Sequence, residues 1–158
     1  MITQGTGPSV VKVDTTVVGN TDGAEDTLTT YTTAAGLLSA LNQSIEIDVW
    51  GTLAANATTK RIRVYFGATV LFDTTALAMN ATDWHIHAEV FRLTATTQIA
   101  FARFSGSPLV TQTSDTTSPA ETLANTLVVK TTGIAGAGFA ANDIVQTGFR
   151  IKINPGTA

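Results

Sequence analysis

Three side chains of metal-ligand type alternate along one segment of the chain: His85, His87 and Glu89. If this segment is a β-strand, residues two apart project from the same face, so the three would form a row. Imidazole and carboxylate groups are ligands that zinc and iron accept. The chain contains only two His, so no third imidazole can complete such a site. We therefore interpret the row as a polar strand face and predict no metal and no other cofactor.

Other catalytic patterns are also weak. Glu46 and Asp48 lie close enough to act as paired carboxylates of a glycoside hydrolase, but Arg61 and Arg63 are expected to neutralise them. The sequence has no nucleophile elbow of the G-x-S-x-G type, no phosphate-binding loop and no dinucleotide fingerprint. It has no Cys, which excludes thiol nucleophiles and disulfides. We predict that the protein is not an enzyme and assign no catalytic residue.

The two Trp residues are the remaining candidates for a binding role. Trp84 shares a strand face with Ile86 and Val90, which predicts a core position. Trp50 lies on the face opposite Ile47 and is expected at the surface. There it could stack on a sugar or anchor a protein interface.

The composition favours a protein with a neutral surface. Of the 158 residues only 13% are charged, the net charge is −3, and about thirty residues are Thr. The few Lys and Arg are scattered, which argues against nucleic-acid binding. The apolar runs are far shorter than the roughly 20 residues that span a bilayer, and the first residues do not resemble a signal peptide. Thr is β-branched and suits a pleated surface that is partly covered by a partner.

The elements that must position these residues are short strands with a period of two. Turn signals separate them at near-regular spacing, which predicts an all-β sandwich of about nine or ten antiparallel strands. The expected strands cover residues 11–17, 27–32, 44–53, 60–66, 69–73, 83–93, 97–104, 109–113, 126–131 and 144–153. Strands 44–53 and 60–66 are expected to pair, so that Glu46 and Asp48 meet Arg61 and Arg63.

Other segments fall outside the strand pattern. Residues 1–8 are expected to form a flexible N-terminal arm, and 9–158 a single domain. Residues 34–41 have some helical propensity but could equally be a connection that ends at Asn42. Residues 116–124 and 133–142 are expected to be loops, and the second, rich in Gly and Ala, would suit close contact with another chain.

Three blocks of the sequence resemble stretches found in structural proteins of tailed-phage virions. They are Asp14 to Thr21, Val49 to Gly67 (VWGTLAANATTKRIRVYFG) and Ala140 to Gln146. The resemblance implies a β-sandwich or jelly-roll-like module. It also implies a capsid decoration, or cement, protein that is assembled in the host cytoplasm and located on the capsid surface of the virion. The alternative is a tail or fibre module that binds a host-surface glycan or another tail protein.

The partners implied by the resemblance are the major capsid protein and copies of the chain itself, as a dimer or trimer, with neither nucleic acid nor membrane. One domain without a repetitive shaft, preceded by a short arm, favours decoration over a fibre. The resemblance supplies no site motif. Candidate partner-binding residues are therefore chosen as apolar, aromatic or arm positions expected at the surface: Ile2, Pro8, Trp50, Tyr65, Phe91 and Phe139.

Overall fold

The computed structural model describes residues 7–79, 83–107 and 113–156, and Ile2 lies outside them. Twelve strands form in these residues, and no helix does. They are β1 (Ser9–Asp14), β2 (Val18–Gly19), β3 (Asp26–Thr32), β4 (Ser44–Leu53), β5 (Thr59–Phe66), β6 (Thr69–Asp73), β7 (Leu77–Ala78), β8 (Asp83–Arg92), β9 (Gln98–Ser107), β10 (Thr113–Thr117), β11 (Val128–Ala135) and β12 (Ile144–Asn154). In the described part of the chain, no helix has the length and apolarity needed to cross a membrane.

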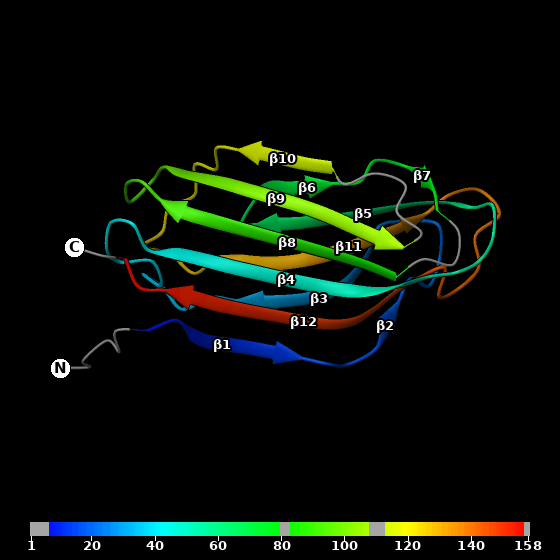
Figure 1. Ribbon diagram of the computed structural model, residues 1–158, viewed down its shortest axis with the longest axis horizontal. Helices are drawn as coiled ribbons and strands as arrows, with labels where there is room; N and C mark the ends of the chain where they lie inside the picture. Colours follow the sequence, from blue (N-terminus) through cyan, green and yellow to red (C-terminus); the bar gives the residue numbers. More distant parts are fainter. Residues whose placement is uncertain (1–6, 80–82, 108–112, 157–158) are drawn as a thin grey trace.

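The strands form two antiparallel sheets packed face to face, as Figure 1 shows. The larger sheet has the order β1-β12-β4-β8-β9-β10, with β2 also paired to β12. The smaller sheet has the order β3-β11-β5-β6, with β7 paired to β5. The predicted all-β sandwich is therefore confirmed, with more strands than the nine or ten expected.

The pairing is nested along the chain. β1 pairs with β12, β3 with β11, β4 with β8, and β5 with β6. Such nesting is what results when one long hairpin rolls up so that successive pairs alternate between two sheets, and it defines the jelly roll. The β9–β10 hairpin arm extends the larger sheet beyond β8.

The core lies between the sheets and follows the alternation in the sequence. Inward-facing side chains of β4, β8 and β12 are fully or almost fully buried: Ile45, Ile47, Val49, Trp84, Ile86, Val90, Phe149 and Ile151. The smaller sheet contributes Ile62, Val64, Phe66 and Val129. The intervening residues of each strand form the two outer surfaces of the sandwich.

The predicted pairing of strands 44–53 and 60–66 is wrong. β4 belongs to the larger sheet and β5 to the smaller one, because the chain crosses between sheets at residues 54–58. Glu46 and Asp48 therefore never meet Arg61 or Arg63. Asp48 binds Arg150 instead, and Arg61 binds Asp73.

Several boundaries also differ. Residues 34–41 form turns rather than a helix, and Asn42 after them adopts a left-handed backbone with φ of 62°. The expected loops lose residues to strands, since β10 extends to Thr117 and β11 to Ala135. The strand expected over 109–113 falls mostly outside the described residues. The strands β2 and β7 were not predicted as separate strands, because they have too few residues to show a period of two.

Candidate binding surfaces on the outer faces of the sheets

The predicted row of His85 and His87 lies on the outer face of β8 and faces Asp48 of β4. The Asp48 Oδ1 atom is 2.9 Å from His87 Nδ1 and 3.3 Å from His85 Nε2. Its Oδ2 atom accepts hydrogen bonds from Arg150 Nε and Nη2 at 3.1 and 2.6 Å. The carboxylate side chain is only 7% exposed. The carboxylate is thus surrounded by cationic or cation-forming groups from two neighbouring strands.

These contacts set the protonation of the cluster. Burial alone would raise the pKa of Asp48, but hydrogen bonds from His87 and Arg150 outweigh it and hold that pKa well below its usual range. The hydrogen bond to Asp48 raises the pKa of His87, against burial, and the charges of Glu46 and Glu89 add to the effect. The cluster therefore pairs opposite charges and links β4 to its two neighbours, β8 and β12.

The third member of the predicted row points to other partners. Glu89 Oε1 accepts hydrogen bonds from Ser44 Oγ at 2.6 Å and Asn154 Nδ2 at 3.3 Å. Glu46 beside it pairs with Lys152 at 2.5 Å. Among the described residues, no group of three or more His, Asp or Glu side chains could hold a metal ion. These contacts hold the polar side chains of this sheet face in place, but the side chains do not converge on a common point.

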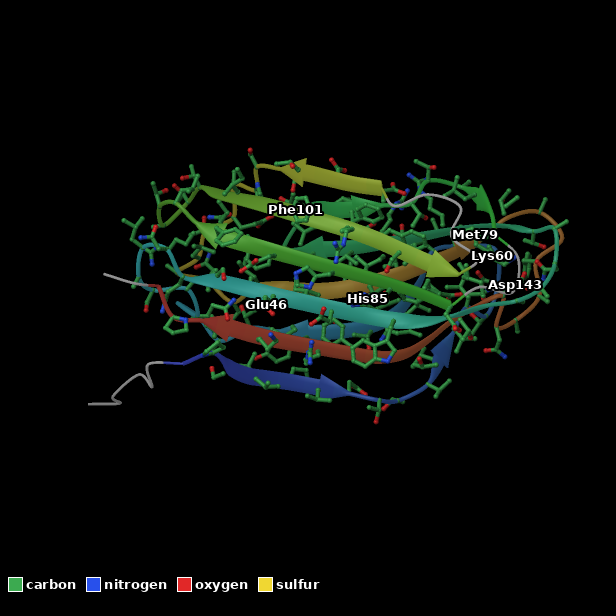
Figure 2. The ribbon with its side chains drawn as sticks, in the orientation of Figure 1. Glu46, Lys60, Met79, His85, Phe101 and Asp143 are labelled. Carbon is green, nitrogen blue, oxygen red and sulfur yellow. The ribbon has the colours of Figure 1, made fainter. Side chains whose placement is uncertain are left out.

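Beyond this polar region, the β8–β9 hairpin exposes a group of large apolar side chains. We name it the apolar corner: Phe91, Leu93, Ile99 and Phe101, which are 37%, 49%, 41% and 43% exposed. Phe91 and Ile99 are direct cross-strand partners, and Phe101 follows Ile99 on the same face. The four therefore form one patch, of the kind that marks interaction sites on soluble proteins. Figure 2 shows Phe101 toward that end of the sheet.

The other end of the same face carries a shallow open depression. It is lined by Trp50, Gly51, Thr52, Asp83, Trp84, His85, Ser105, Gly106 and Thr147. Trp84 itself is core, as predicted, and its indole nitrogen donates to the Thr52 carbonyl oxygen at 3.3 Å. Trp50 is half-buried, and its ring lies over Gly148, where a Cβ atom would overlap it. Trp50 thus lines a surface hollow with hydroxyl and carboxylate neighbours.

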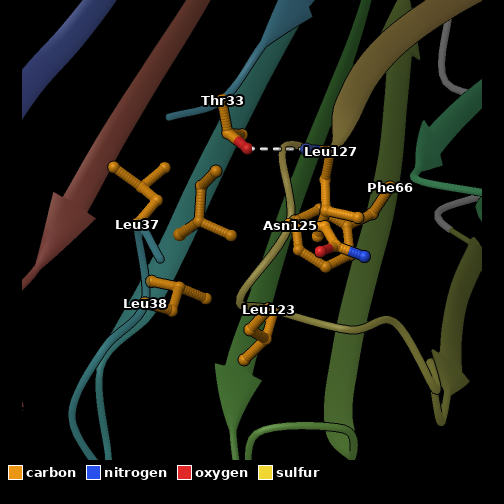
Figure 3. A pocket seen from close by; sticks show the side chains of 8 residues that line it. Thr33, Leu37, Leu38, Phe66, Leu123, Asn125 and Leu127 are labelled. Carbon is orange, nitrogen blue, oxygen red and sulfur yellow. Dashed lines mark hydrogen bonds between the residues drawn. The ribbon is translucent and has the colours of Figure 1, made fainter. Parts of the chain in front are cut away.

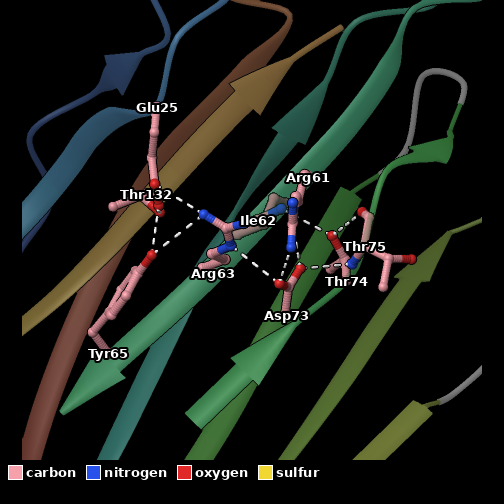
Figure 4. Close-up of polar contacts among 9 residues, drawn as sticks. All are labelled: Glu25, Arg61, Ile62, Arg63, Tyr65, Asp73, Thr74, Thr75 and Thr132. Carbon is pink, nitrogen blue, oxygen red and sulfur yellow. Dashed lines mark hydrogen bonds and ion pairs between the residues drawn. The ribbon is translucent and has the colours of Figure 1, made fainter. Parts of the chain in front are cut away.

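The smaller sheet carries a different polar surface, shown in Figure 4. The Glu25 carboxylate accepts hydrogen bonds from Tyr65 Oη at 2.7 Å, Arg63 Nη1 at 2.9 Å and Thr132 Oγ1 at 2.6 Å. The Lys130 ammonium also lies 4.4 Å from the centre of the Tyr65 ring. Tyr65, predicted as a partner-binding residue, is thus held within the protein's own network.

The same network continues to Asp73, which Arg61 binds through two nitrogens at 2.8 and 2.5 Å. Arg63 Nε adds a third hydrogen bond at 3.1 Å. The hydrogen bonds from Arg61, together with those from Arg63 and a backbone amide, lower the pKa of Asp73 to about 2 despite burial. The arginines of this face are therefore used internally and form no free basic patch.

The predicted partner-binding residues do not form one site. Phe91 belongs to the apolar corner, Trp50 to the depression and Tyr65 to the opposite sheet. Pro8 is exposed just before β1, which begins at the same end of the sandwich as the β8–β9 turn (Figure 1). Phe139 is 44% exposed in the loop between β11 and β12, at the other end.

Sequence reasoning missed three members of the apolar corner: Leu93, Ile99 and Phe101. Both faces of β9 carry apolar residues, so alternation alone could not identify the exposed one. The β8–β9 register would have placed Ile99 opposite Phe91.

A small cavity lies inside the part of the sandwich that the structure describes. A cavity of about 10 Å³ lies among Thr33, Leu37, Leu38, Ile45, Phe66, Leu123, Asn125 and Leu127 (Figure 3). That is room for about one water molecule. This cavity is therefore too small for a ligand larger than water.

The chain was compared with protein-family models and with curated protein sequences. No family model matches it, and no curated sequence matches it.

Proposed function

We propose that the protein is a structural component of a virion, a capsid decoration protein that binds the major capsid protein shell through the apolar corner. The exposed corner is the observation that carries the proposal. Four large apolar side chains on one hairpin are unfavourable in water and become favourable when another protein covers them. The jelly-roll topology and the charge-poor, Thr-rich composition are compatible with this role, and the sequence resemblance suggests the virion.

The size of the corner indicates what kind of interface it would join. At their observed exposures the four side chains present roughly 300 Å² of apolar surface, worth about 7 kcal/mol when fully covered. Association costs are of similar size, and a standard interface buries about 800 Å² on each partner. The corner would therefore be the centre of a larger contact that includes neighbouring Thr-rich surface. Copies of the chain joined as a dimer or trimer would add avidity.

The proposal is tested by cosedimentation of the purified chain with capsid shells that lack it. We expect saturable, stoichiometric binding that is weakened at least tenfold by Phe101→Ser. Phe139→Ser is the matched control, because Phe139 has nearly the same exposure but lies at the opposite end of the sandwich. Binding that depends on Phe139 and not on Phe101 would contradict the assignment of the corner.

A second candidate function is a tail or fibre module that binds a host-surface glycan. The observation that favours it is the depression, where Trp50 stands beside Asp83, Ser105 and Thr52. Aromatic rings flanked by hydroxyl and carboxylate groups are suited to sugars. Binding of the chain on a glycan array, lost on Trp50→Ala, would support this function over capsid decoration. No binding to any glycan would rule against it.

A further inference from the structure

The edge strands of the two sheets differ in how well they are protected against pairing with another chain. Among the described strands of five or more residues, β1 and β10 lie at the edges of the larger sheet and β3 and β6 at those of the smaller one. In three of them one residue has no partner across the ladder: Val11 in β1, Leu28 in β3 and Leu71 in β6. Such a bulge twists an edge strand and hinders the addition of a further strand. The five residues of β10 pair with β9 without any shift.

β10 also has an accessible outer edge. In the part of the chain that the structure describes, β9 is the only strand paired with β10, and Figure 1 shows β10 as the outermost strand at the top of the view. Consecutive residues of a strand project to opposite faces, and Asp115 and Thr116 are both exposed. β10 contains neither Lys nor Pro, the residues that commonly protect an edge. Backbone groups on alternate residues of β10 point away from β9 and can therefore bind another strand.

The register brings two side chains of β9 beside this edge. Phe101 is opposite Thr116, and Arg103 is opposite Ser114. Phe101 is 43% exposed as part of the apolar corner, and Arg103 is exposed two residues further along the same face. The outer face next to β10 thus presents an aromatic ring followed by a guanidinium group.

Arg103 has no partner within the described residues. The chain has nine Lys and Arg, all of them described, and all but Arg103 contact other groups of the chain. Two carboxylates of the same face are bound elsewhere, Asp48 to Arg150 and Glu46 to Lys152. An exposed guanidinium of this kind is suited to a carboxylate of another protein, and Arg is enriched among the residues that dominate interfaces.

We propose that the capsid partner adds an extended segment to the outer edge of β10, antiparallel to it, with an apolar residue opposite Thr116 and an Asp or Glu opposite Ser114. These positions are two residues apart, so the segment has the pattern apolar-x-acidic. Neighbouring strands lie about 4.8 Å apart, which places the added strand about 10 Å from β9. The apolar side chain would extend over Thr116 toward Phe101, and the carboxylate would bind Arg103. Main-chain hydrogen bonds would give affinity, and these two side chains would give specificity.

A second copy of the chain is a poor occupant of this edge. Two copies of β10 related by a two-fold axis would pair antiparallel, and the register that uses all five residues brings the two Asp115 residues opposite each other. Like charges directly opposite each other in a ladder are destabilising. The inference rests on the proposed function, since the partner is the capsid protein, and it adds the mode of binding and the chemistry of the partner's segment.

The test compares amide hydrogen exchange of the full-length chain, alone and bound to capsid shells that lack it. We expect exchange within residues 115–117 to slow in the bound chain, because hydrogen bonds to the added strand would protect the outward amides. The amides of β1, the bulged edge on the other side of the same sheet, are the internal control and should be unchanged.

A charge reversal tests the acidic position of the partner's segment. Arg103→Glu should weaken shell binding by about tenfold or more. Lys130→Glu is the matched control, because it makes the same change of charge beside Tyr65 on the smaller sheet, and it should bind like the wild-type chain.

Shell binding that depends on Phe101 but leaves the β10 amides unprotected would overturn the inference and leave the proposed function standing. Wild-type binding by Arg103→Glu, or an equal loss in Lys130→Glu, would also overturn it, because Arg103 would then have no specific role. If the wild-type chain does not bind the shells at all, the proposed function fails, and the strand addition fails with it.

Discussion

Replacement of Asp48 by Asn tests the polar tie on the outer face of the larger sheet. The carboxylate is 7% exposed and accepts hydrogen bonds from Arg150 and His87. Hydrogen bonds to charged groups contribute about 1.5–3 kcal/mol each. Arg150 and His87 are partly exposed, so water would hydrate them in the variant. The loss of stability is therefore smaller than for a fully buried ion pair. We expect the free energy of unfolding to fall by about 3 kcal/mol.

The assay is urea unfolding at pH 7, followed by circular dichroism. Asp115→Asn is the matched control: it makes the same chemical change at an exposed position of β10 and should alter stability by no more than about 0.5 kcal/mol. A loss below about 1 kcal/mol for Asp48→Asn would refute the reasoning that this carboxylate ties three strands together.

The same variant makes a prediction about pH. The pKa of His87 is raised in the folded protein, so its contribution is fully present below the unfolded value near 6.5 and is lost as pH rises through the folded value. Asp48 has a lowered pKa, so its own contribution is lost only at acidic pH, as pH falls toward the folded value. Wild-type stability should therefore decrease as pH rises above about 6.5. This slope should flatten in Asp48→Asn, and an unchanged slope would be inconsistent with the pairing.

Two further substitutions test the packing. Gly148→Ala would force a methyl group into the indole of Trp50. We expect the free energy of unfolding in urea to fall by roughly 1–3 kcal/mol and the tryptophan emission to shift. Wild-type values for both would contradict the close approach of Trp50 to Gly148. Thr131→Val removes a fully buried hydroxyl that has no hydrogen-bond partner among the described residues. This substitution should leave stability unchanged or raise it by up to about 1 kcal/mol. A clear loss of stability would show that the Thr131 hydroxyl forms a hydrogen bond in the folded protein.

The sequence was sufficient to predict the class of fold. Burial on one face imposes a period of two, and β4 is confirmed at both of its predicted boundaries, while β8 and β12 match to within one residue. Gly67, with φ of 60°, likewise marks the turn between β5 and β6.

The pairing between sheets could not be predicted in the same way. Two neighbouring strands with opposite charges suggest a hairpin, and neighbours in sequence usually pair. Here the chain crosses to the other sheet instead, so Asp48 meets Arg150, about a hundred residues away. No local feature of the sequence indicates that two residues so far apart along the chain pair in the fold.

Lys60 shows a different limit of sequence reasoning. It has the same parity as Ile62 and Val64, and all three are fully buried. A lysine at the end of a strand is usually expected to reach solvent. Its burial depends on oxygens from Asn56, Thr58 and Met79, which only the folded loops bring together.

The most direct test of the proposed role is the position of this chain in a density map of the virion. Capsid decoration predicts one chain at each equivalent site over the shell, with the apolar corner covered by the major capsid protein. Density for the chain only at the tail, or on the shell with Phe91 and Phe101 facing solvent, would contradict the account.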